Sequence, residues 1–323
     1  MTSQKWESSI LKTLPYLCFL ILLVTYAPLS HSRENESWQM VESAHFQVYY
    51  HPHAISPQEI VDIAEDFYPT LDRLINGIPM DKIEIWVCET QEQFQAAVHA
   101  PIQDWAIGCA FPLSSRIVIQ NPRVILQREF QLSQIIRHEI VHVVFGQRTQ
   151  KTIRGIPLWF NEGVAIYLSG EWVPRRHELL LKHVFSKSTI PLSKLVDEFP
   201  KSESLAQLAY AESLNAVTWL TEIAGVDKLW EIIDLLGKGN DLNTAYKEAI
   251  GWELATFDVE WRNSLPRRYH WMALFSSSYL FWGSLALLVV LVYLRSRYRS
   301  RQRLVELEQE DMEVDAFFKQ NST

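Results

Sequence analysis

The sequence predicts an α+β fold, because segments typical of strands come first and segments typical of helices come later. The expected strands lie within residues 38–125, and residues 126–265 are mostly helical in pattern. This separation favours one sheet with helices packed against it over alternating βαβ units. A chain of 323 residues with 48% hydrophobic residues can hold one large domain or two.

Hydrophobic periodicity assigns the elements. Alternating apolar and polar residues predict strands, and apolar residues every three or four positions predict helices. The expected strands are 44–50, 83–88, 105–111 and 115–120, and the first expected helices are 56–75 and 91–98. Later helices are expected over 205–220, 228–236, 242–250 and 254–265. Gly237 and Gly251 are expected to end two of them.

A helix that carries His138, Glu139 and His142 holds the most informative chemistry. Residues four apart share one face of a helix, so both imidazoles can point at one ion and Glu139 can reach a water bound to it. This is the H-E-x-x-H pattern of zinc metallopeptidases. Ser133 is expected to cap the start of this helix and Gly146 to end it.

A second apolar helix, expected to begin at Pro157, carries Glu162 twenty residues after His142. A lone carboxylate inside an apolar run needs a partner or a metal. Two histidines and one carboxylate, with a fourth position left to water, are typical of a catalytic zinc site. The alternative is that His138 and His142 are core histidines with satisfied hydrogen bonds, beside a solvated Glu139.

The H-E-x-x-H helix followed by Trp-Phe-Asn-Glu-Gly-Val-Ala at 159–165 resembles the gluzincin zinc metallopeptidases of the peptidase MA-like (thermolysin-like) domain family. Metzincins would need glycine at position 145 and histidine at 148, where this chain has Phe145 and Arg148. The resemblance implies a zincin-like fold, in which an N-terminal mixed sheet precedes a helical active-site and C-terminal region. It also implies that an edge strand, expected at 115–120, pairs with an extended peptide substrate.

The resemblance further implies an oxyanion donor, because gluzincins commonly use a tyrosine or histidine for this purpose. Tyr210 lies in a matching Tyr-x-x-Ser segment and is the first candidate, and Tyr167 is the second. A packing role is the alternative for both. Thermolysin has an aspartate one turn after its glutamate ligand, where this chain has Ile166. The partner that orients a histidine must therefore come from elsewhere or be a main-chain carbonyl.

Together these residues predict a zinc-dependent metallopeptidase. Zn²⁺ is expected on His138, His142 and Glu162, with Glu139 as the general base that takes a proton from the attacking water. The alternative is a catalytically weak or inactive zinc-binding module that recognises peptides or relays a signal outside the cytoplasm.

Two uncharged apolar segments predict attachment to a membrane. Residues 14–29 follow two lysines, so residues 1–32 are expected to be a signal peptide, with a retained N-terminal anchor as the alternative. Residues 274–294 are a 21-residue run without charge, about enough to cross a ~30 Å hydrocarbon core. A transmembrane helix is therefore expected over 272–294, with a buried soluble helix as the alternative.

Charge then predicts topology and partners. Five arginines between 295 and 303 favour a cytoplasmic tail over 295–323 and an extracytoplasmic peptidase domain over 33–271. That domain holds 22 basic and 31 acidic residues, a net charge of −9 that argues against nucleic acid. The expected partners are a peptide or protein substrate near the membrane, and the lipid bilayer.

The cysteines leave two interpretations open. Cys18 lies in the N-terminal apolar segment, so Cys88 and Cys109 are the pair that remains if that segment is cleaved. In an oxidising compartment they can form a disulfide. Two buried free thiols are the alternative, since each lies in a strand-like run.

Overall fold

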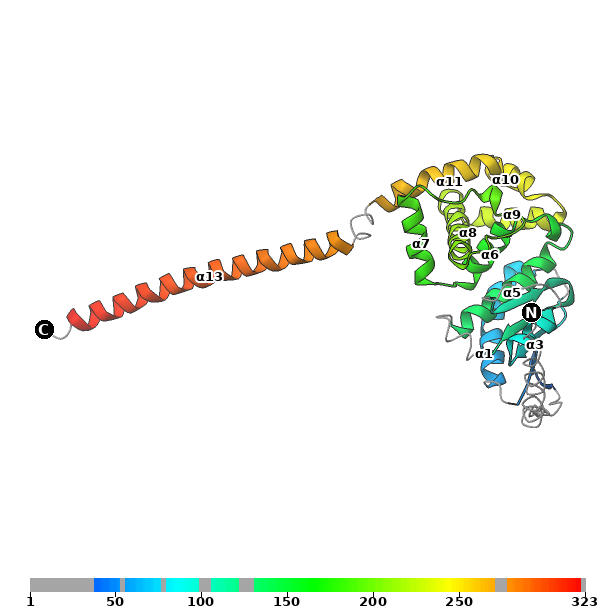
Figure 1. The fold of residues 1–323 in the computed structure, drawn as a ribbon, viewed down its shortest axis with the longest axis horizontal. Helices are drawn as coiled ribbons and strands as arrows, with labels where there is room; N and C mark the ends of the chain where they lie inside the picture. Colours follow the sequence, from blue (N-terminus) through cyan, green and yellow to red (C-terminus); the bar gives the residue numbers. More distant parts are fainter. Residues whose placement is uncertain are drawn as a thin grey trace, which may run out of the picture.

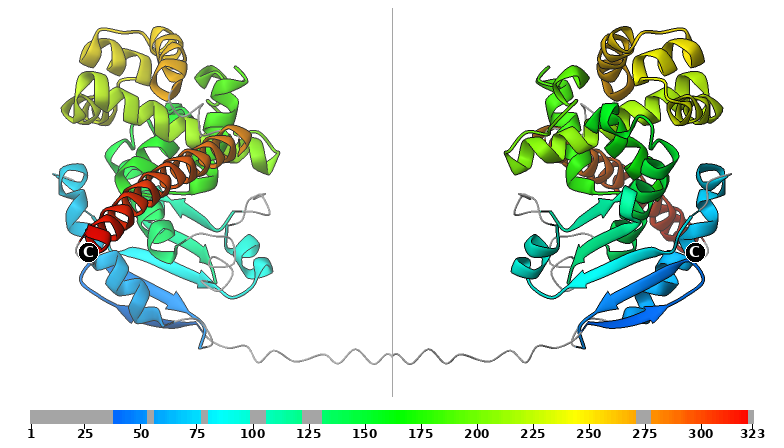
Figure 2. Two further views of the ribbon diagram at one scale, coloured as in Figure 1. Left: turned by 90° about the vertical axis from the view of Figure 1, so that its left-hand side faces the viewer. Right: turned by 90° about the vertical axis from the view of Figure 1, so that its right-hand side faces the viewer.

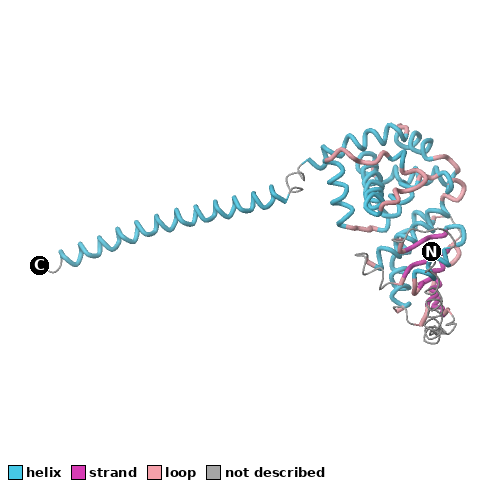
Figure 3. The backbone as a smooth tube through the Cα atoms, in the orientation of Figure 1, coloured by secondary structure: helices cyan, strands magenta, loops and turns pink. Residues whose placement is uncertain are grey.

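The computed structural model describes residues 38–52, 56–76, 80–98, 106–121, 131–270 and 278–320. The expected signal peptide at 1–32 lies outside these residues. The strands gather in one half of the molecule and the other half is helical, as Figures 1, 2 and 3 show. The α+β prediction is confirmed by this separation.

A five-stranded mixed sheet occupies the N-terminal half, in the order β1-β2-β3-β5-β4. The central pairs β2–β3 and β3–β5 are parallel, whereas β1 and β4 join the two edges antiparallel. The bounds are β1 Gln39–Glu42, β2 Phe46–Tyr50, β3 Ile83–Cys88, β4 Gly108–Phe111 and β5 Arg116–Gln120. β1 has no counterpart among the expected strands.

The expectation that 115–120 forms the edge strand is wrong. β5 lies between β3 and β4, with Ile117 paired to Ile85 on one side and to Ala110 on the other. β4 is the edge on this side of the sheet. Side chains of β5 are buried on both faces, as befits a strand with neighbours on both sides.

Helices cover both faces of the sheet. The pieces α1 (Pro57–Phe67), η1 (Tyr68–Leu71) and α2 (Asp72–Ile75) correspond to the expected helix over 56–75, with a 3₁₀ turn where Pro69 interrupts the α-helical pattern. α1 packs with α5 (Leu132–Arg148), which also contacts β4 and β5. The short helix α3 (Gln91–Val98) packs against β3 and β5 through a separate cluster.

α5 is longer than the glycine signal suggests. It begins at Leu132, before Ser133, and runs through Gly146 to Arg148. A Cβ at Gly146 would lie 2.5 Å from side-chain carbons of Pro112, so this glycine permits a close approach between α5 and the turn after β4. Ser133 is therefore not the N-cap, and Gly146 is a packing residue and not a helix end.

The C-terminal half is built from helices. Those between residues 158 and 269 are α6 (Leu158–Ser169), α7 (Pro174–Phe185), α8 (Glu203–Ala224), α9 (Val226–Lys238), α10 (Leu242–Ile250) and α11 (Leu254–Tyr269). α7 was not expected from the sequence. α9 continues past Gly237 and ends at Gly239, which adopts a φ of 111°, whereas Gly251 ends α10 as expected.

Two acidic side chains hold the segment between α7 and α8 in place. The fully buried Glu212 carboxylate on α8 accepts the Ile190 backbone N–H at 3.0 and 3.2 Å. Asp258 on α11 accepts the Leu192 N–H at 3.2 Å and pairs with Arg262. Burial raises the pKa of Glu212 to about 8, and the nearby Asp258 acts in the same direction.

This buried carboxyl makes the free energy of unfolding depend on pH. The pKa of Glu212 in the folded protein lies above its ordinary value of 4.5. The stability that its protonated form contributes is therefore fully present below pH 4.5 and is lost as the pH rises through about 8. Glutamine has no proton to lose, so we expect Glu212→Gln to be more stable relative to wild type at pH 8 than at pH 5. The difference in free energy of unfolding between variant and wild type should grow by about 3 kcal/mol between the two pH values. Urea titrations at both pH values measure this, and an equal effect at the two would contradict it.

The expected transmembrane helix at 272–294 is wrong. In the part of the chain that the structure describes, no helix is long and apolar enough to cross a membrane. α13 (Ser278–Gln320) projects from the body of the molecule, but only its first 17 residues precede Arg295. At 1.5 Å per residue those residues span about 25 Å, less than a ~30 Å hydrocarbon core. Residues 272–277 lie outside the described part. The topology predicted from this span, an extracytoplasmic domain over 33–271 and a cytoplasmic tail over 295–323, is not supported.

Candidate metal centre

The structure brings His138, His142 and Glu162 together, with one ligand atom from each within 4.8 Å of the others. α5 presents both histidines on one face, and α6 packs against α5 so that Glu162 faces them. The His138 and His142 Nε2 atoms lie 3.0 Å apart. Glu162 Oε2 lies 3.3 Å from the first nitrogen and 3.5 Å from the second.

These spacings suit a tetrahedral zinc ion. Bonds of 2.0–2.2 Å at tetrahedral angles separate neighbouring ligand atoms by about 3.3–3.5 Å. Glu162 lies 3.3 and 3.5 Å from the two histidine nitrogens, within this range, and the two nitrogens lie slightly closer to each other, at 3.0 Å. Two imidazole nitrogens and a carboxylate oxygen that converge in this way offer lone pairs to a common point, so the donor set fits one ion.

Glu139 is buried beside this group and faces the edge strand β4. A Cβ added to Gly108 of β4 would lie 2.9 Å from the carboxyl carbon of Glu139 and nearer still to Oε1. A side chain at position 108 would therefore displace the carboxylate. Burial raises the pKa of Glu139, although His138 and His142 oppose the shift, so the ionised group is a stronger base than an exposed glutamate.

Each histidine has a polar neighbour at its other ring nitrogen, an ion-pair contact for His138 and a hydrogen bond for His142. His138 Nδ1 lies 2.8 Å from Oε2 of Glu171, a buried carboxylate just after the end of α6. His142 Nδ1 lies 3.3 Å from Oδ1 of Asn161, the residue before Glu162. Such partners fix the ring orientation and the tautomer of metal-binding histidines.

Glu171 is itself held by Arg176 of α7, which lies 2.5 Å away. Burial favours a higher pKa for Glu171, but Arg176 and His138 hold that pKa at about 2. His138 is buried too, yet the Glu171 and Glu162 carboxylates raise its pKa well above the ordinary range. Two carboxylates thus converge on one imidazole, a negative environment that favours a cation.

Comparison with known proteins identifies the family. The peptidase MA superfamily model matches residues 64–267, which is more than half of the chain. This range contains His138, Glu139, His142 and Glu162. The chain belongs to the peptidase MA superfamily. The predicted resemblance to gluzincin, peptidase MA-like proteins is thereby confirmed.

Individual relatives of this superfamily member are distant. A Bacillus subtilis (strain 168) protein, named uncharacterized protein YhcO, is 25% identical over 140 residues, which are 42% of this chain and 41% of the relative. The M1 zinc metallopeptidase from Deinococcus radiodurans is 13% identical with a TM-score of 0.38, over 70% of this chain and 50% of that one. A mutant of a two-domain M1 zinc metallopeptidase bound to L-tryptophan is 12% identical with a TM-score of 0.40, over 70% of this chain and 51% of the other.

The chain spans about two fifths of the Bacillus relative and about half of each M1 structure.

Both tyrosines proposed as oxyanion donors lie on helices of the peptidase MA unit. Tyr210 is on α8, with its ring 4.9 Å from Phe199 and 4.5 Å from the Arg176 guanidinium. Burial and the nearby Glu162 raise the pKa of Tyr210, so its hydroxyl stays protonated. Tyr167 is on α6 and packs against the hydrophobic core.

Cys88 and Cys109 are free thiols in the structure. Burial raises the pKa values of Cys88 and Cys109 to about 12, so both remain protonated at neutral pH. The disulfide interpretation is not supported, and neutral thiols are poor metal ligands.

Gly163 on α6 sets how closely this helix approaches α8. A Cβ at Gly163, the residue after Glu162, would lie 2.5 Å from the Ser213 carbonyl oxygen of α8. α6 and α8 therefore meet backbone to backbone beside the candidate metal ligand, in a contact that only glycine allows.

Sequence reasoning missed Glu171, Asn161 and Arg176. Asn161 directly precedes the predicted ligand Glu162, and this adjacency could have indicated that its side chain reaches the metal centre. Glu171 follows Gly170, whose φ of 67° turns the chain back towards α5, and no periodicity reports such a turn. The resemblance to thermolysin places the orienting carboxylate at position 166, which in this chain is the buried Ile166 of α6.

We expect Glu171→Gln to weaken zinc binding by about 10–100-fold, because the amide of similar shape lacks the negative charge that faces His138. Competition with a chelator of known affinity measures the dissociation constant. Glu178→Gln, on the exposed side of α7, is the matched control and should leave the affinity unchanged. Equal affinity for Glu171→Gln and wild type would show that this contact does not tune the metal.

Proposed function

We propose that this chain is a zinc metallopeptidase that hydrolyses peptide bonds, with His138, His142 and Glu162 as the metal ligands and Glu139 as the general base. The convergence of three donor atoms within 4.8 Å, with Glu139 buried beside them, is the observation that carries the proposal. An intact glutamate at 139 favours catalysis over binding alone, because a binding module has no need of a base.

The base acts on a water that the centre activates. A bound zinc ion would lower the pKa of a coordinated water towards ~7 and polarise the scissile carbonyl. Glu139 accepts a proton from the attacking water as its oxygen bonds to the carbonyl carbon. When the carbon–nitrogen bond breaks, Glu139 returns that proton to the leaving amine, so the carboxylate is regenerated.

Other residues hold the geometry of the reaction. Glu171 and Asn161 keep the two imidazoles aimed at one point, 2.8 and 3.3 Å from their outer nitrogens. Tyr210 is proposed as the donor to the carbonyl oxygen as charge develops there. An extended substrate would lie along the outer edge of β4, which pairs with no other strand in the described part of the chain. There, main-chain hydrogen bonds give affinity with little sequence choice.

We expect Gly108→Ala to lower kcat by about tenfold or more, because the new methyl group displaces Glu139 from the edge strand. Zinc affinity and the melting temperature should stay close to wild type, since the displaced atoms are the end of a flexible side chain. Gly155→Ala is the matched control, because a Cβ there meets nothing within 4 Å. If Gly108→Ala turns over peptides at the wild-type rate, the position of Glu139 beside β4 does not matter for catalysis.

A broad peptide library tests the proposed function as a whole. The purified chain should contain about one zinc per molecule and cleave a subset of peptides, and a chelator should stop cleavage that added zinc restores. Zinc binding without cleavage of any peptide would reject the peptidase and leave a metal-binding recognition module.

A further inference from the structure

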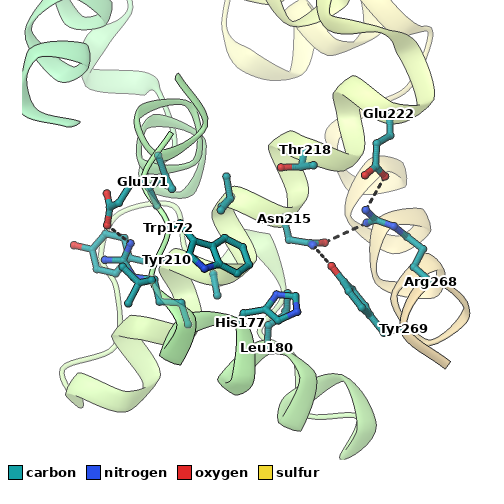
Figure 4. Close-up of a pocket in the computed structure, with 15 residues that line it drawn as sticks. Glu171, Trp172, His177, Leu180, Tyr210, Asn215, Thr218, Glu222, Arg268 and Tyr269 are labelled. Carbon is teal, nitrogen blue, oxygen red and sulfur yellow. Dashed lines mark hydrogen bonds and ion pairs between the residues drawn. The ribbon is translucent and has the colours of Figure 1, made fainter. Parts of the chain in front are cut away.

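A cavity of about 190 Å³ lies between α7, α8 and α11 (Figure 4). Its apolar surface comes from aromatic and aliphatic side chains, among them Trp172, His177, Leu180 and Tyr269. Trp172 is 56% exposed, a large value for an indole and one that leaves much of this ring open to a ligand.

The polar groups in the wall already pair with one another. Asn215 donates to the Tyr269 hydroxyl at 2.6 Å and accepts from the Trp261 indole at 3.0 Å. Arg268 pairs with Glu222 at 2.6 Å. Burial lowers the pKa of His177, which favours the neutral ring. The cavity thus selects against a charged ligand, which would have to break these pairs or remain unpaired.

Size and geometry favour an aromatic ring. An apolar cavity of about 150 Å³ can hold benzene, and this one is about 190 Å³. The ring of His177 lies 5.4 Å from that of Trp172 and 6.0 Å from that of Tyr269, so the aromatic rings already meet at tilted and edge-on angles. A further ring could join them by the same edge-to-face contacts.

The cavity shares residues with the metal centre. Glu171, Arg176 and Tyr210 also line it. Glu171 contacts His138 on its other side, and Arg176 joins Glu171 to the Tyr210 ring. A ligand in the cavity would therefore touch the groups that orient one proposed zinc ligand and hold the proposed oxyanion donor.

We propose that this cavity binds a single uncharged aromatic ring of the size of phenol or indole. The ring is carried either by a side chain of the peptide substrate, which rests on the proposed function, or by a free small molecule, which does not.

Ligand-detected NMR titration of the full chain with indole tests the site without any need for hydrolysis. We expect saturable binding with a dissociation constant of about 1 mM or below. Thr218→Trp places an indole in the cavity from α8 and should weaken binding at least tenfold, whereas Leu205→Trp adds the same group at an exposed position of that helix and should not. Trp172→Ala removes an exposed wall residue and should also weaken binding, which provides a second variant if Thr218→Trp fails to fold.

The source of the ring follows from cleavage assays. Indole that raises KM only for peptides with an aromatic residue near the cleaved bond indicates a substrate side chain. Indole that changes kcat for all peptides alike indicates a free molecule. Equal indole binding by wild type and Thr218→Trp, or no binding by wild type, would overturn the proposal, whether or not the chain proves to be a peptidase.

Discussion

Replacing Glu139 with glutamine should lower kcat for peptide hydrolysis by about 10²–10⁴-fold while one zinc per chain stays bound. The amide has nearly the shape of the carboxylate but cannot accept the proton of the attacking water. Glu139 is buried in the space that Gly108 leaves open, and glutamine fits that space without displacing β4. The ligand atoms of His138, His142 and Glu162 are untouched, so metal content should not change.

Metal analysis and steady-state kinetics on the same preparation distinguish a general base from a metal ligand at position 139. His142→Ala is the comparison variant, because it should lose zinc and activity together, whereas Glu139→Gln should lose activity alone. If Glu139→Gln cleaves peptides at the wild-type rate, the base is another group. If it loses zinc, Glu139 belongs to the ligand set.

Removing the Tyr210 hydroxyl should lower kcat by about 10²–10³-fold, the effect measured for loss of one oxyanion donor. Phenylalanine keeps the ring that packs between Arg176 and Phe199, so α8 should keep its place. The raised pKa of Tyr210 keeps the hydroxyl protonated and able to donate. KM should change far less than kcat, because the hydrogen bond strengthens only as charge develops on the carbonyl oxygen.

Tyr167→Phe is the matched control for this experiment. Tyr167 is the second candidate donor and lies on α6, near Glu162 in sequence, but its ring packs against the hydrophobic core. Kinetics and melting temperatures of both variants decide between the two tyrosines. A large loss in Tyr167→Phe with none in Tyr210→Phe would exchange their roles, and no loss in either would assign the donor to another group.

The sequence predicted the helices of the metal centre well because their signals are local. The pair His138 and His142 depends only on helical periodicity, and Glu162 stands out as a charge within an apolar run. The strand at 83–88 and the helix at 91–98 were also predicted with the same bounds as in the structure. In each of these cases the residues that define the element are close together along the chain.

Features that depend on chain crossings were not predicted. The edge of the sheet was assigned to 115–120, but strand order places β4 outside β5, and chain order alone does not specify that arrangement. Glu171 and Arg176 join the centre only because the chain turns at Gly170. The uncharged run at 274–294 is long enough in sequence to cross a membrane, but the apolar part of the described helix α13 is not.

The backbone contact at Gly163 restricts how this molecule could admit a substrate. α6 and α8 approach so closely that the Ser213 carbonyl oxygen fills the space of a side chain, and a hinge between these helices would break the tightest contact beside Glu162. The Glu162 carboxylate and the helix that carries Tyr210 therefore behave as one rigid body. We therefore expect substrates to enter from the side of β4, with motion of that short edge strand, and not separation of α6 from α8, setting the rate of entry.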